Sequence, residues 1–160
     1  MLLSVCVVNW NTREFLRECL AALRNCPPRS SEMEIIVIDN SSADHSAEMV
    51  ASEFPEVQLF AKKKNLGYAM GNNQALRRAS GDWILLLNPD VIVHDDTLTN
   101  AIDFAAQHEG AAAIGARLIG TNGETQRSVR AFPDPAPVLW EYLGLARLFL
   151  RGEAGHDLGV

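Results

Sequence analysis

Residues 3–26 read LSVCVVNWNTREFLRECLAALRNC, and this stretch decides the fold. Its first six residues are almost continuously apolar and rich in Val, the pattern of a strand covered on both faces in a parallel sheet. Thr12 is the expected N-cap of a following helix, which Pro27 ends. The apolar residues of that helix recur at helical spacing; they are Phe15, Leu16, Cys19, Leu20 and Leu23. One strand followed by one amphipathic helix is therefore predicted.

The same unit repeats along the chain. The patterns predict strands over 34–38, 57–60, 83–87 and 111–119 and helices over 44–54, 68–79 and 96–107. The pair Asn122-Gly123 indicates a short hairpin near 119–130. Strands alternating with helices imply right-handed crossovers and a mainly parallel sheet with helices on both faces, so the fold class is α/β. Ligands of such sheets bind beyond the carboxyl ends of the strands.

The bulk composition narrows the range of partners. The chain has 160 residues, 48% of them hydrophobic, which is the size and apolar content of one ordinary globular domain. A net charge of -6 gives no broad positive field, so we expect no nucleic acid as a partner. We interpret Lys62 to Lys64 as a solvated loop rather than a phosphate clamp. The four histidines lie in separate settings and indicate no metal cluster.

The cysteines, the N-terminus and the apolar runs indicate where in the cell the protein is expected. Cys6, Cys19 and Cys26 have no metal-ligand spacing and are expected to be reduced, structural thiols, as in the cytoplasm. The N-terminus lacks the basic start and the cleavage site of a signal peptide. No apolar run approaches the roughly 18 residues that span a bilayer, so we expect at most peripheral association with the inner face of the membrane.

A compositional shift near residues 132–137, which read FPDPAP, indicates an extended loop before an apolar helix over 138–150. This shift sets the expected domain boundary. Residues 1–131 are predicted to form one α/β domain that binds the ligand. Residues 132–160 are predicted to begin an acceptor-side region or to be a truncated C-terminal extension.

Polar residues follow four successive predicted strands. These clusters are Asn9 to Thr12, Asp39 to Ser42, Asn65-Leu66-Gly67, and Asn88-Pro89-Asp90. One crevice at the carboxyl edge of the sheet can collect all four. Asp39 lies at the rim of a low-dielectric sheet, where accepting a hydrogen bond from a base imide or a ribose hydroxyl is specific. The alternative is that Asp39 caps the next helix, but Ser41 and Ser42 can do that, which favours binding.

Asp90 ends a wholly apolar strand, where a carboxylate is costly unless it is paired, hydrogen-bonded or bound to a cation. Mg²⁺ or Mn²⁺ needs only one or two protein carboxylates when a diphosphate and waters complete its shell. A turn residue is the alternative, since Asn-Pro-Asp is also good turn chemistry. Asp90 alone leaves the two alternatives evenly balanced.

Together these motifs resemble family 2 glycosyltransferases of the GT-A fold. The resemblance rests on VVNWN at 7–11, VIDNSS at 37–42, NLGYA at 65–69 followed by GNN at 71–73, and LLLNPD at 85–90. The nearest likeness is to bacterial rhamnosyltransferase-like members that build cell-surface polysaccharides. Four motifs in the same order and spacing over about ninety residues are far more specific than any one tetrapeptide.

The resemblance implies a nucleotide-sugar site, with a UDP- or dTDP-sugar as donor and a saccharide or lipid-linked acceptor. Asp39 would contact the nucleobase, and Asp90 would bind the metal, Mg²⁺ or Mn²⁺. The other residues implied in nucleotide-sugar binding are Asn9, Asn11, Thr12, Asn40, Asn65, Gly67 and Asn88. Asn88 departs from the usual Asp-x-Asp of the family, which leaves its amide able to hydrogen-bond the sugar or ribose.

The resemblance also implies an inverting transfer in which an acceptor-side Asp or Glu acts as general base, in a later part of a longer chain. No catalytic residue is assigned. Asp134 and Glu141 are the carboxylates in that region, and each also suits a loop or a solvated helix face. The chain is expected to be an N-terminal portion, so the activity of these 160 residues alone is open.

Two other functions compete with a transferase. A non-catalytic nucleotide-sugar-binding module, or a truncated relic without the acceptor half, is predicted equally well by the same residues. A receiver-like signalling domain would have a phosphorylated Asp after a strand, but would leave Asn65-Leu66-Gly67 and Asn88-Pro89-Asp90 without a role. It ranks third.

Overall fold

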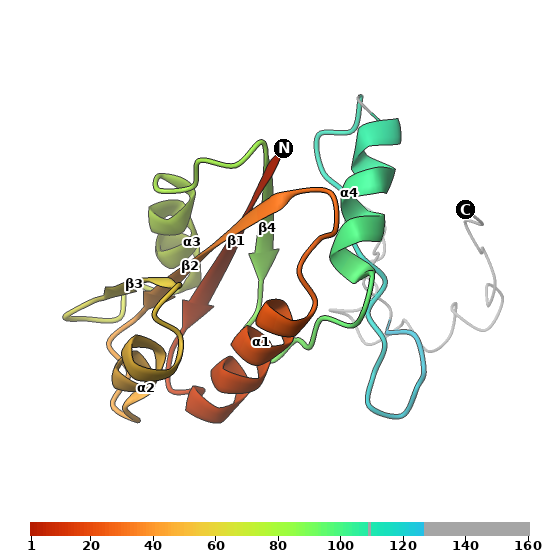
Figure 1. The fold of residues 1–160 in the computed structure, drawn as a ribbon. Coiled ribbons are helices and arrows are strands. Elements are labelled where there is room, and N and C mark those ends of the chain that lie inside the picture. Colours follow the sequence, from red (N-terminus) through yellow and green to blue (C-terminus); the bar gives the residue numbers. More distant parts are fainter. Residues whose placement is uncertain (109, 127–160) are drawn as a thin grey trace, which may run out of the picture. The chain divides into compact units, whose positions relative to one another are not determined.

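The structure is a computed structural model that describes residues 1–108 and 110–126 (Figure 1). A first compact unit comprises Met1–Ile114, and a second begins at Gly115. Strands and helices alternate in the first unit, and each lies within a few residues of its predicted bounds. They are β1 (Leu2–Asn9), α1 (Arg13–Asn25), β2 (Glu32–Asp39), α2 (Ser46–Glu53), β3 (Gln58–Ala61), α3 (Tyr68–Leu76), β4 (Trp83–Leu87) and α4 (Thr97–Gln107).

The four strands form one parallel sheet with the order β3-β2-β1-β4. In this register Asn9 lies beside Asp39, and Val7 lies beside Leu87. The chain moves outward from β1 to β3 and then returns to place β4 on the other side of β1. The strand order therefore reverses between β1 and β4, the position at which open α/β sheets form a ligand crevice.

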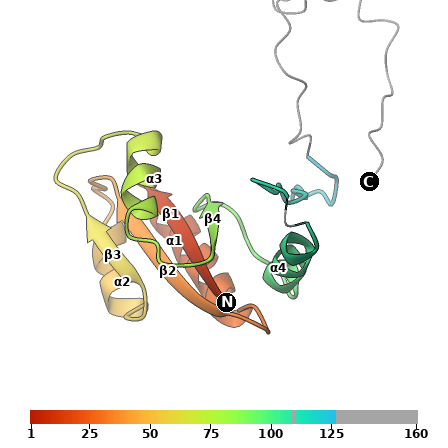
Figure 2. The ribbon, with the colours of Figure 1, turned by 90° about the horizontal axis from the view of Figure 1, so that it is seen from above.

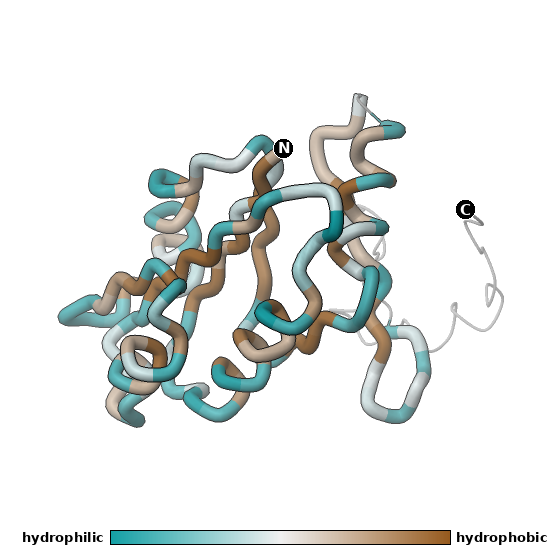
Figure 3. Tube along the Cα trace, viewed as in Figure 1, coloured by the Kyte–Doolittle hydropathy of each residue, from teal (hydrophilic) through white to brown (hydrophobic). Residues whose placement is uncertain are grey.

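Helices cover both faces of the sheet, as predicted. In Figure 2, α3 lies on one face, and α1 and α2 lie on the other. The strands are hydrophobic along most of their length (Figure 3). Successive β1 side chains alternate between two buried clusters, because Val5 and Val7 pack with residues of α1 and α2, whereas Cys6 and Val8 pack with Ala75 of α3.

Helix α3 approaches the sheet closely at Gly71. A Cβ atom at this position would lie 2.7 Å from Val8 Cγ1, too close for any side chain without movement of the strand or the helix. The missing side chain therefore sets the distance between α3 and β1. Tyr68 is the first residue of this helix.

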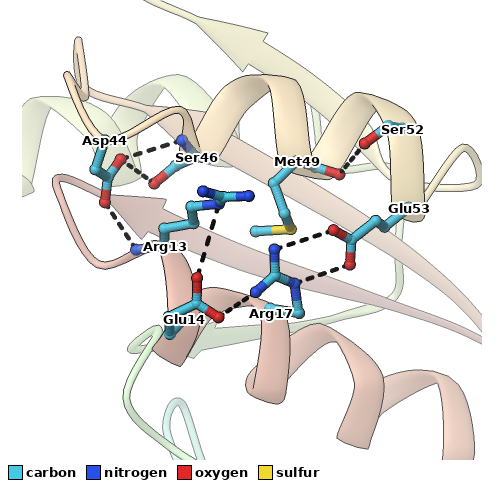
Figure 4. A network of polar contacts seen from close by, with 8 residues as sticks. All are labelled: Arg13, Glu14, Arg17, Asp44, Ser46, Met49, Ser52 and Glu53. Atoms are coloured by element: carbon cyan, nitrogen blue, oxygen red, sulfur yellow. Dashed lines mark hydrogen bonds and ion pairs between the residues drawn. The ribbon is translucent and has the colours of Figure 1, made fainter.

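Polar contacts join α1 to α2 and to the loop that precedes α2 (Figure 4). Arg17 donates to both carboxylate oxygens of Glu53, at 2.9 and 3.0 Å. The backbone amide of Arg13 donates to Asp44 Oδ2 at 2.9 Å, and Asp44 Oδ1 accepts from the Ser46 amide at 3.1 Å. Burial by itself would raise the pKa of Asp44, but the hydrogen bonds from the Ser46 hydroxyl and from the amides of Arg13 and Ser46 outweigh it and lower the pKa. Ionised Asp44 thus holds together the loops that follow β1 and β2.

The stripe of apolar residues on α1 was predicted with one error. Leu16, Cys19, Leu20 and Leu23 have no exposed surface, but Phe15 is 56% exposed. The first four positions already form a complete helical stripe, and Phe15 lies beside it rather than on it. Burial, followed by the negative charge of Asp90, raises the pKa of the Cys19 thiol to about 12, which agrees with the predicted structural role.

The strand predicted over 111–119 is absent from the structure, since residues 111–118 form neither helix nor strand. Among the described residues no strand pairs with them, and Ile114 and Leu118 are exposed. The predicted hairpin is present in short form. Ile119 and Thr125 make a single antiparallel bridge, and Gly123 has the positive φ of 79° that the Asn-Gly pair predicts.

Several predictions fall outside the described residues. These are the boundary at 131/132, the loop over 132–137, the helix over 138–150, and the carboxylates Asp134 and Glu141. Within residues 1–108 and 110–126, no helix has the length and apolar content needed to cross a bilayer.

Candidate functional site

Asp39 is the centre of a buried hydrogen-bond cluster at the carboxyl edge. Its Oδ1 accepts from Asn9 Nδ2 at 2.8 Å and from Ser42 Oγ at 2.6 Å, and its Oδ2 accepts from the Ser42 amide at 3.0 Å. Thr12 Oγ1 in turn donates to Asn9 Oδ1 at 2.6 Å. Helix α2 begins only at Ser46, so the alternative that Asp39 caps this helix is wrong.

The cluster leaves one acceptor position on Asp39. Each carboxylate oxygen has two lone pairs, and Oδ2 accepts a single hydrogen bond among the described residues. That position suits an imide N–H. Asp39 is only 2% exposed and Asn9 is not exposed at all, so the carboxylate lies almost entirely below the surface.

The loops after β1 and β2 lie beside this cluster, and each contains a residue with a positive φ, which residues other than glycine rarely adopt. Asn11 has φ 54° and Ser41 has φ 67°. The amide of Asn11 donates to Ser42 Oγ at 2.9 Å, and Asn11 Oδ1 accepts from the Ala43 amide at 2.7 Å. Asn11 therefore holds the two loops against each other, although it is itself exposed.

Asn40 connects this cluster to the loop before α3. Its Nδ2 donates to the Gly67 carbonyl at 3.1 Å, whereas its buried Oδ1 has no partner among the described residues. Asn65 Oδ1 accepts from the Gly67 amide at 2.7 Å, and Gly67 has φ 83°. Asn40 is 2% exposed, so it supports the loop from beneath, while Asn65 and Gly67 lie at the surface.

An open pocket of about 470 Å³ lies at the reversal of strand order between β1 and β4. Asn88 and Asp90 line it from the loop after β4, and Thr12 lines it from the start of α1. The lining also includes two aromatic residues that sequence reasoning did not assign to the site, Phe15 and Tyr68. Tyr68 contacts Asn88, since its hydroxyl donates to Asn88 Oδ1 at 2.9 Å.

The sequence carried a partial signal for these two aromatics. Tyr68 stands inside one of the four motifs, but its contact with Asn88 spans twenty residues and depends on the packing of α3. Phe15 fell within a plausible apolar stripe, and only its exposure separates it from that stripe.

All four predicted polar clusters do reach the same edge of the sheet.

Asp90 is exposed at the mouth of the pocket. The loop there is a turn, because the Val91 amide donates to the Asn88 carbonyl at 3.3 Å, but no described residue donates to the Asp90 carboxylate. The described residues contain no group of three or more His, Cys, Asp or Glu that could hold a metal by itself. A lone carboxylate does suit Mg²⁺ or Mn²⁺ when a diphosphate and water complete the shell.

Known proteins resemble this chain in sequence. A glycosyltransferase of Bacillus subtilis, YfnE, described as uncharacterised, is 38% identical over 109 residues, or 66% of this chain and 25% of its own length. An N-acetylglucosaminyl-diphospho-decaprenol L-rhamnosyltransferase of Mycobacterium tuberculosis is 24% identical over 143 residues, or 82% of this chain and 46% of its own length. The chain thus spans less than half the length of these relatives.

Solved glycosyltransferase structures resemble this chain in fold. S. aureus TarS in complex with UDP matches with a TM-score of 0.61 and 26% identity, covering 68% of this chain and 33% of that one. The mannosyltransferase PcManGT of Pyrobaculum calidifontis, in complex with GDP-Man and Mn²⁺, matches with a TM-score of 0.59 and 28% identity, covering 65% of this chain and 32% of that one.

The predicted α/β class and the GT-A likeness are confirmed by these neighbours and by the parallel sheet. The sequence model described as "Glycosyl transferase family 2" matches residues 4–154. That match covers most of the 160 residues, and the chain therefore belongs to glycosyl transferase family 2.

Proposed function

We propose that this chain is the nucleotide-sugar-binding part of an inverting glycosyltransferase of cell-surface polysaccharide synthesis. The donor is a UDP- or dTDP-sugar, and the acceptor is a saccharide or a lipid-linked saccharide. The observation that carries the proposal is the pocket between β1 and β4, which has the exposed carboxylate of Asp90 at its mouth and Asp39 in the same edge of the sheet. The complexes of related structures with UDP and GDP-Man support a nucleotide donor.

In this proposal Asp39 and Asp90 bind different parts of the nucleotide sugar. Asp39 accepts a hydrogen bond from the base at its free Oδ2 position, and the segments Asn9 to Thr12 and Asn65 to Gly67 border the nucleotide. Asn9 and Asn40 are buried, so their part is to support Asp39 and the Gly67 loop. Asp90 would hold a Mg²⁺ or Mn²⁺ ion, with a diphosphate completing its ligands, and the bound ion would neutralise charge on the leaving diphosphate.

In the transfer itself, the acceptor hydroxyl attacks the anomeric carbon from the face opposite the diphosphate. The bond from this carbon to the diphosphate oxygen breaks, and the configuration inverts. A carboxylate removes the proton of the attacking hydroxyl. We propose that the donor-binding region covers residues 1–131 and that the acceptor side begins at residues 132–160. We further propose that the enzyme acts in the cytoplasm, at the inner face of the membrane when its acceptor is lipid-linked.

The 160-residue chain is expected to bind donor and to transfer no sugar. Calorimetry with UDP and dTDP in Mg²⁺ should give dissociation constants between about 1 μM and 1 mM, the usual range for enzyme substrates. A transfer assay with a nucleotide sugar and added saccharide acceptors provides the second readout. Absence of binding to both nucleotides would contradict the proposed function. Robust transfer would contradict the expectation that these 160 residues lack the general base, and Asp134 and Glu141 would be the first residues to test.

The same pair of measurements addresses the rival function. A non-catalytic module binds the donor as tightly but gives no transfer in the full-length protein either. Transfer by the full-length protein, lost when its acceptor-side carboxylates are substituted, supports the enzyme.

A further inference from the structure

The segment from β3 to the end of α3 carries a local positive charge in an acidic chain. Residues 57–81 contain three lysines and two arginines but no Asp or Glu, whereas the whole chain has a net charge of -6. Lys62 to Lys64 lie in the loop after β3, and Arg77 and Arg78 follow α3. All of them are exposed except Lys62, which is partly buried. Five positive charges therefore gather on a short stretch of an otherwise negative protein.

The arginines elsewhere in the first unit are paired with carboxylates. These ion pairs are Arg13–Glu14, Arg17–Glu53, Arg24–Glu56 and Arg29–Asp96. Within residues 1–108 and 110–126, no ion pair involves Lys62 to Lys64, Arg77 or Arg78. The described part of the chain therefore leaves the positive charge of residues 57–81 available to an outside partner.

The lysine loop and the end of α3 meet at the ring of Phe60. Arg78 Cζ lies 4.3 Å from the centroid of this ring, and Lys62 Nζ lies 5.9 Å from it. The two groups of cations therefore form one surface. Like charges beside one ring repel each other, and no described carboxylate is paired with either of them. An anionic partner at this surface would relieve the repulsion.

Exposed apolar side chains adjoin the lysines. Leu66, Tyr68 and Met70 are 39%, 54% and 48% exposed, and all three follow Lys64 closely in the loop and the first turn of α3. The loop projects beyond the edge of the sheet (Figure 1). Cations that meet lipid phosphates, beside apolar side chains that enter the headgroup layer, are typical of a peripheral membrane surface.

The aliphatic side chains favour a membrane over a nucleic acid. Leu66 and Met70 can enter a lipid headgroup layer, but they neither pair with phosphates nor offer a ring on which bases stack. A protein with a net charge of -6 also meets an anionic membrane most favourably through the one face where its positive charges gather.

We propose that residues 62–70, together with Arg77 and Arg78, form a surface that docks on an anionic phospholipid membrane. We call it the β3–α3 surface. Its lysines and arginines bind lipid phosphates, and Leu66 and Met70 enter the headgroup layer.

The position of this surface gives it a part in the reaction. Tyr68 belongs to the surface and also lines the pocket that contains Asp90, so a docked membrane would lie beside that pocket. A lipid-linked acceptor held in the membrane would then reach the donor without leaving the bilayer. In this respect the inference rests on the proposed function, which takes the acceptor to be a saccharide or a lipid-linked saccharide.

Vesicle sedimentation of the 160-residue chain without nucleotide tests the surface. Wild type should bind vesicles of equal parts phosphatidylglycerol and phosphatidylcholine at least about tenfold more tightly than vesicles of phosphatidylcholine alone. Lys63→Gln/Lys64→Gln, the lysine variant, should bind the anionic vesicles about 20- to 30-fold more weakly, because each cation near such a membrane contributes about fivefold. At about 1 M salt this difference should disappear, since screening is then almost complete.

A matched control removes the same charge from another part of the first unit. Arg24→Gln/Arg29→Gln takes two positive charges from exposed positions and should leave vesicle affinity nearly unchanged. Met70→Ser tests the apolar part and should weaken binding about 3- to 10-fold, the effect of losing one partly buried side chain of this size. Phe104→Ser is its control, since Phe104 is 44% exposed on α4. Thermal unfolding of each variant checks that the fold is retained.

Three results of the vesicle assay would overturn the inference. They are equal binding of wild type to anionic and neutral vesicles, unchanged binding in the lysine variant, and equal losses in the lysine variant and the arginine control. Tighter binding of a single-stranded oligonucleotide than of vesicles, lost in the lysine variant, would replace the membrane by nucleic acid as the partner.

Calorimetry with UDP separates the β3–α3 surface from the nucleotide site. The lysine variant should bind UDP as wild type does, and weaker UDP binding would assign the lysines to the diphosphate and overturn the inference. Wild type that binds anionic vesicles but neither UDP nor dTDP supports the surface and contradicts the proposed function. Wild type that binds nucleotide but not the vesicles overturns the surface alone.

Discussion

Asp39→Ala is expected to weaken the binding of UDP or dTDP by about 10- to 150-fold. This range corresponds to about 1.5–3 kcal/mol, the contribution of one hydrogen bond to a charged group. The reason lies in the free acceptor position of Oδ2, which suits the imide N–H of uracil or thymine. Calorimetric titration of wild type and variant with both nucleotides measures the difference.

The structure adds a second consequence, because Asp39 also holds Asn9 and Ser42. Its removal leaves buried donors without a partner and should lower the free energy of unfolding by about 1–3 kcal/mol. Ser42→Ala is the matched control, since it removes hydrogen bonds from the same cluster but keeps the carboxylate. Ser42→Ala should bind nucleotide far better than Asp39→Ala. Equal losses in the two variants would show that Asp39 acts by supporting the loops, and unchanged affinity would remove it from the site.

Asp90→Asn is expected to abolish the coupling between metal and nucleotide. One acidic ligand should hold Mn²⁺ poorly in the absence of nucleotide, because hard cations give up water reluctantly and need several oxygens. Nucleoside diphosphate supplies the missing ligands, so each partner should raise the affinity of the other by the same factor, about 5- to 150-fold. Titrations of Mn²⁺ with and without UDP measure this factor in the wild type and the variant.

Asp103→Asn serves as the control, since it removes the same charge from an exposed position on α4. The coupling factor should fall to about one in Asp90→Asn and stay at the wild-type value in Asp103→Asn. Equal Mn²⁺ affinity with and without nucleotide in the wild type would mean that Asp90 is only a turn residue. Coupling that survives in Asp90→Asn would place the metal on other ligands.

The fold of the first unit followed from local patterns. The Val-rich run of β1 and the stripe from Leu16 to Leu23 each fix an element and its buried face, and the repeated alternation fixes the parallel sheet. Residues 111–119 have a similar apolar content without a partner strand among the described residues. Periodicity reports the preference of a segment, whereas a strand also needs neighbouring backbone groups to bond with. The sequence of the segment alone does not show whether a neighbouring strand is available.

The candidate site was predictable in its location and not in its contacts. Parallel strands bring their carboxyl ends together, so polar residues after successive strands had to meet at one edge. Asp39 accepts hydrogen bonds from Asn9 and Ser42, and Asn88 accepts one from Tyr68. These contacts join residues on different elements, and they arise from the register of β1 and β2 and from the close approach of α3 at Gly71. Such distances cannot be read from spacing along the chain.

The central claim is that a nucleoside diphosphate binds at the carboxyl edge of this sheet. NMR of the ¹⁵N-labelled 160-residue chain, titrated with UDP and with dTDP in Mg²⁺, tests it directly, because each backbone amide reports on its own surroundings. The largest shift changes should fall in Asn9–Thr12, Asp39–Ser42, Asn65–Tyr68 and Asn88–Asp90. Spectra that stay unchanged with both nucleotides, or changes confined to α4 and the amino ends of the strands, would contradict the account.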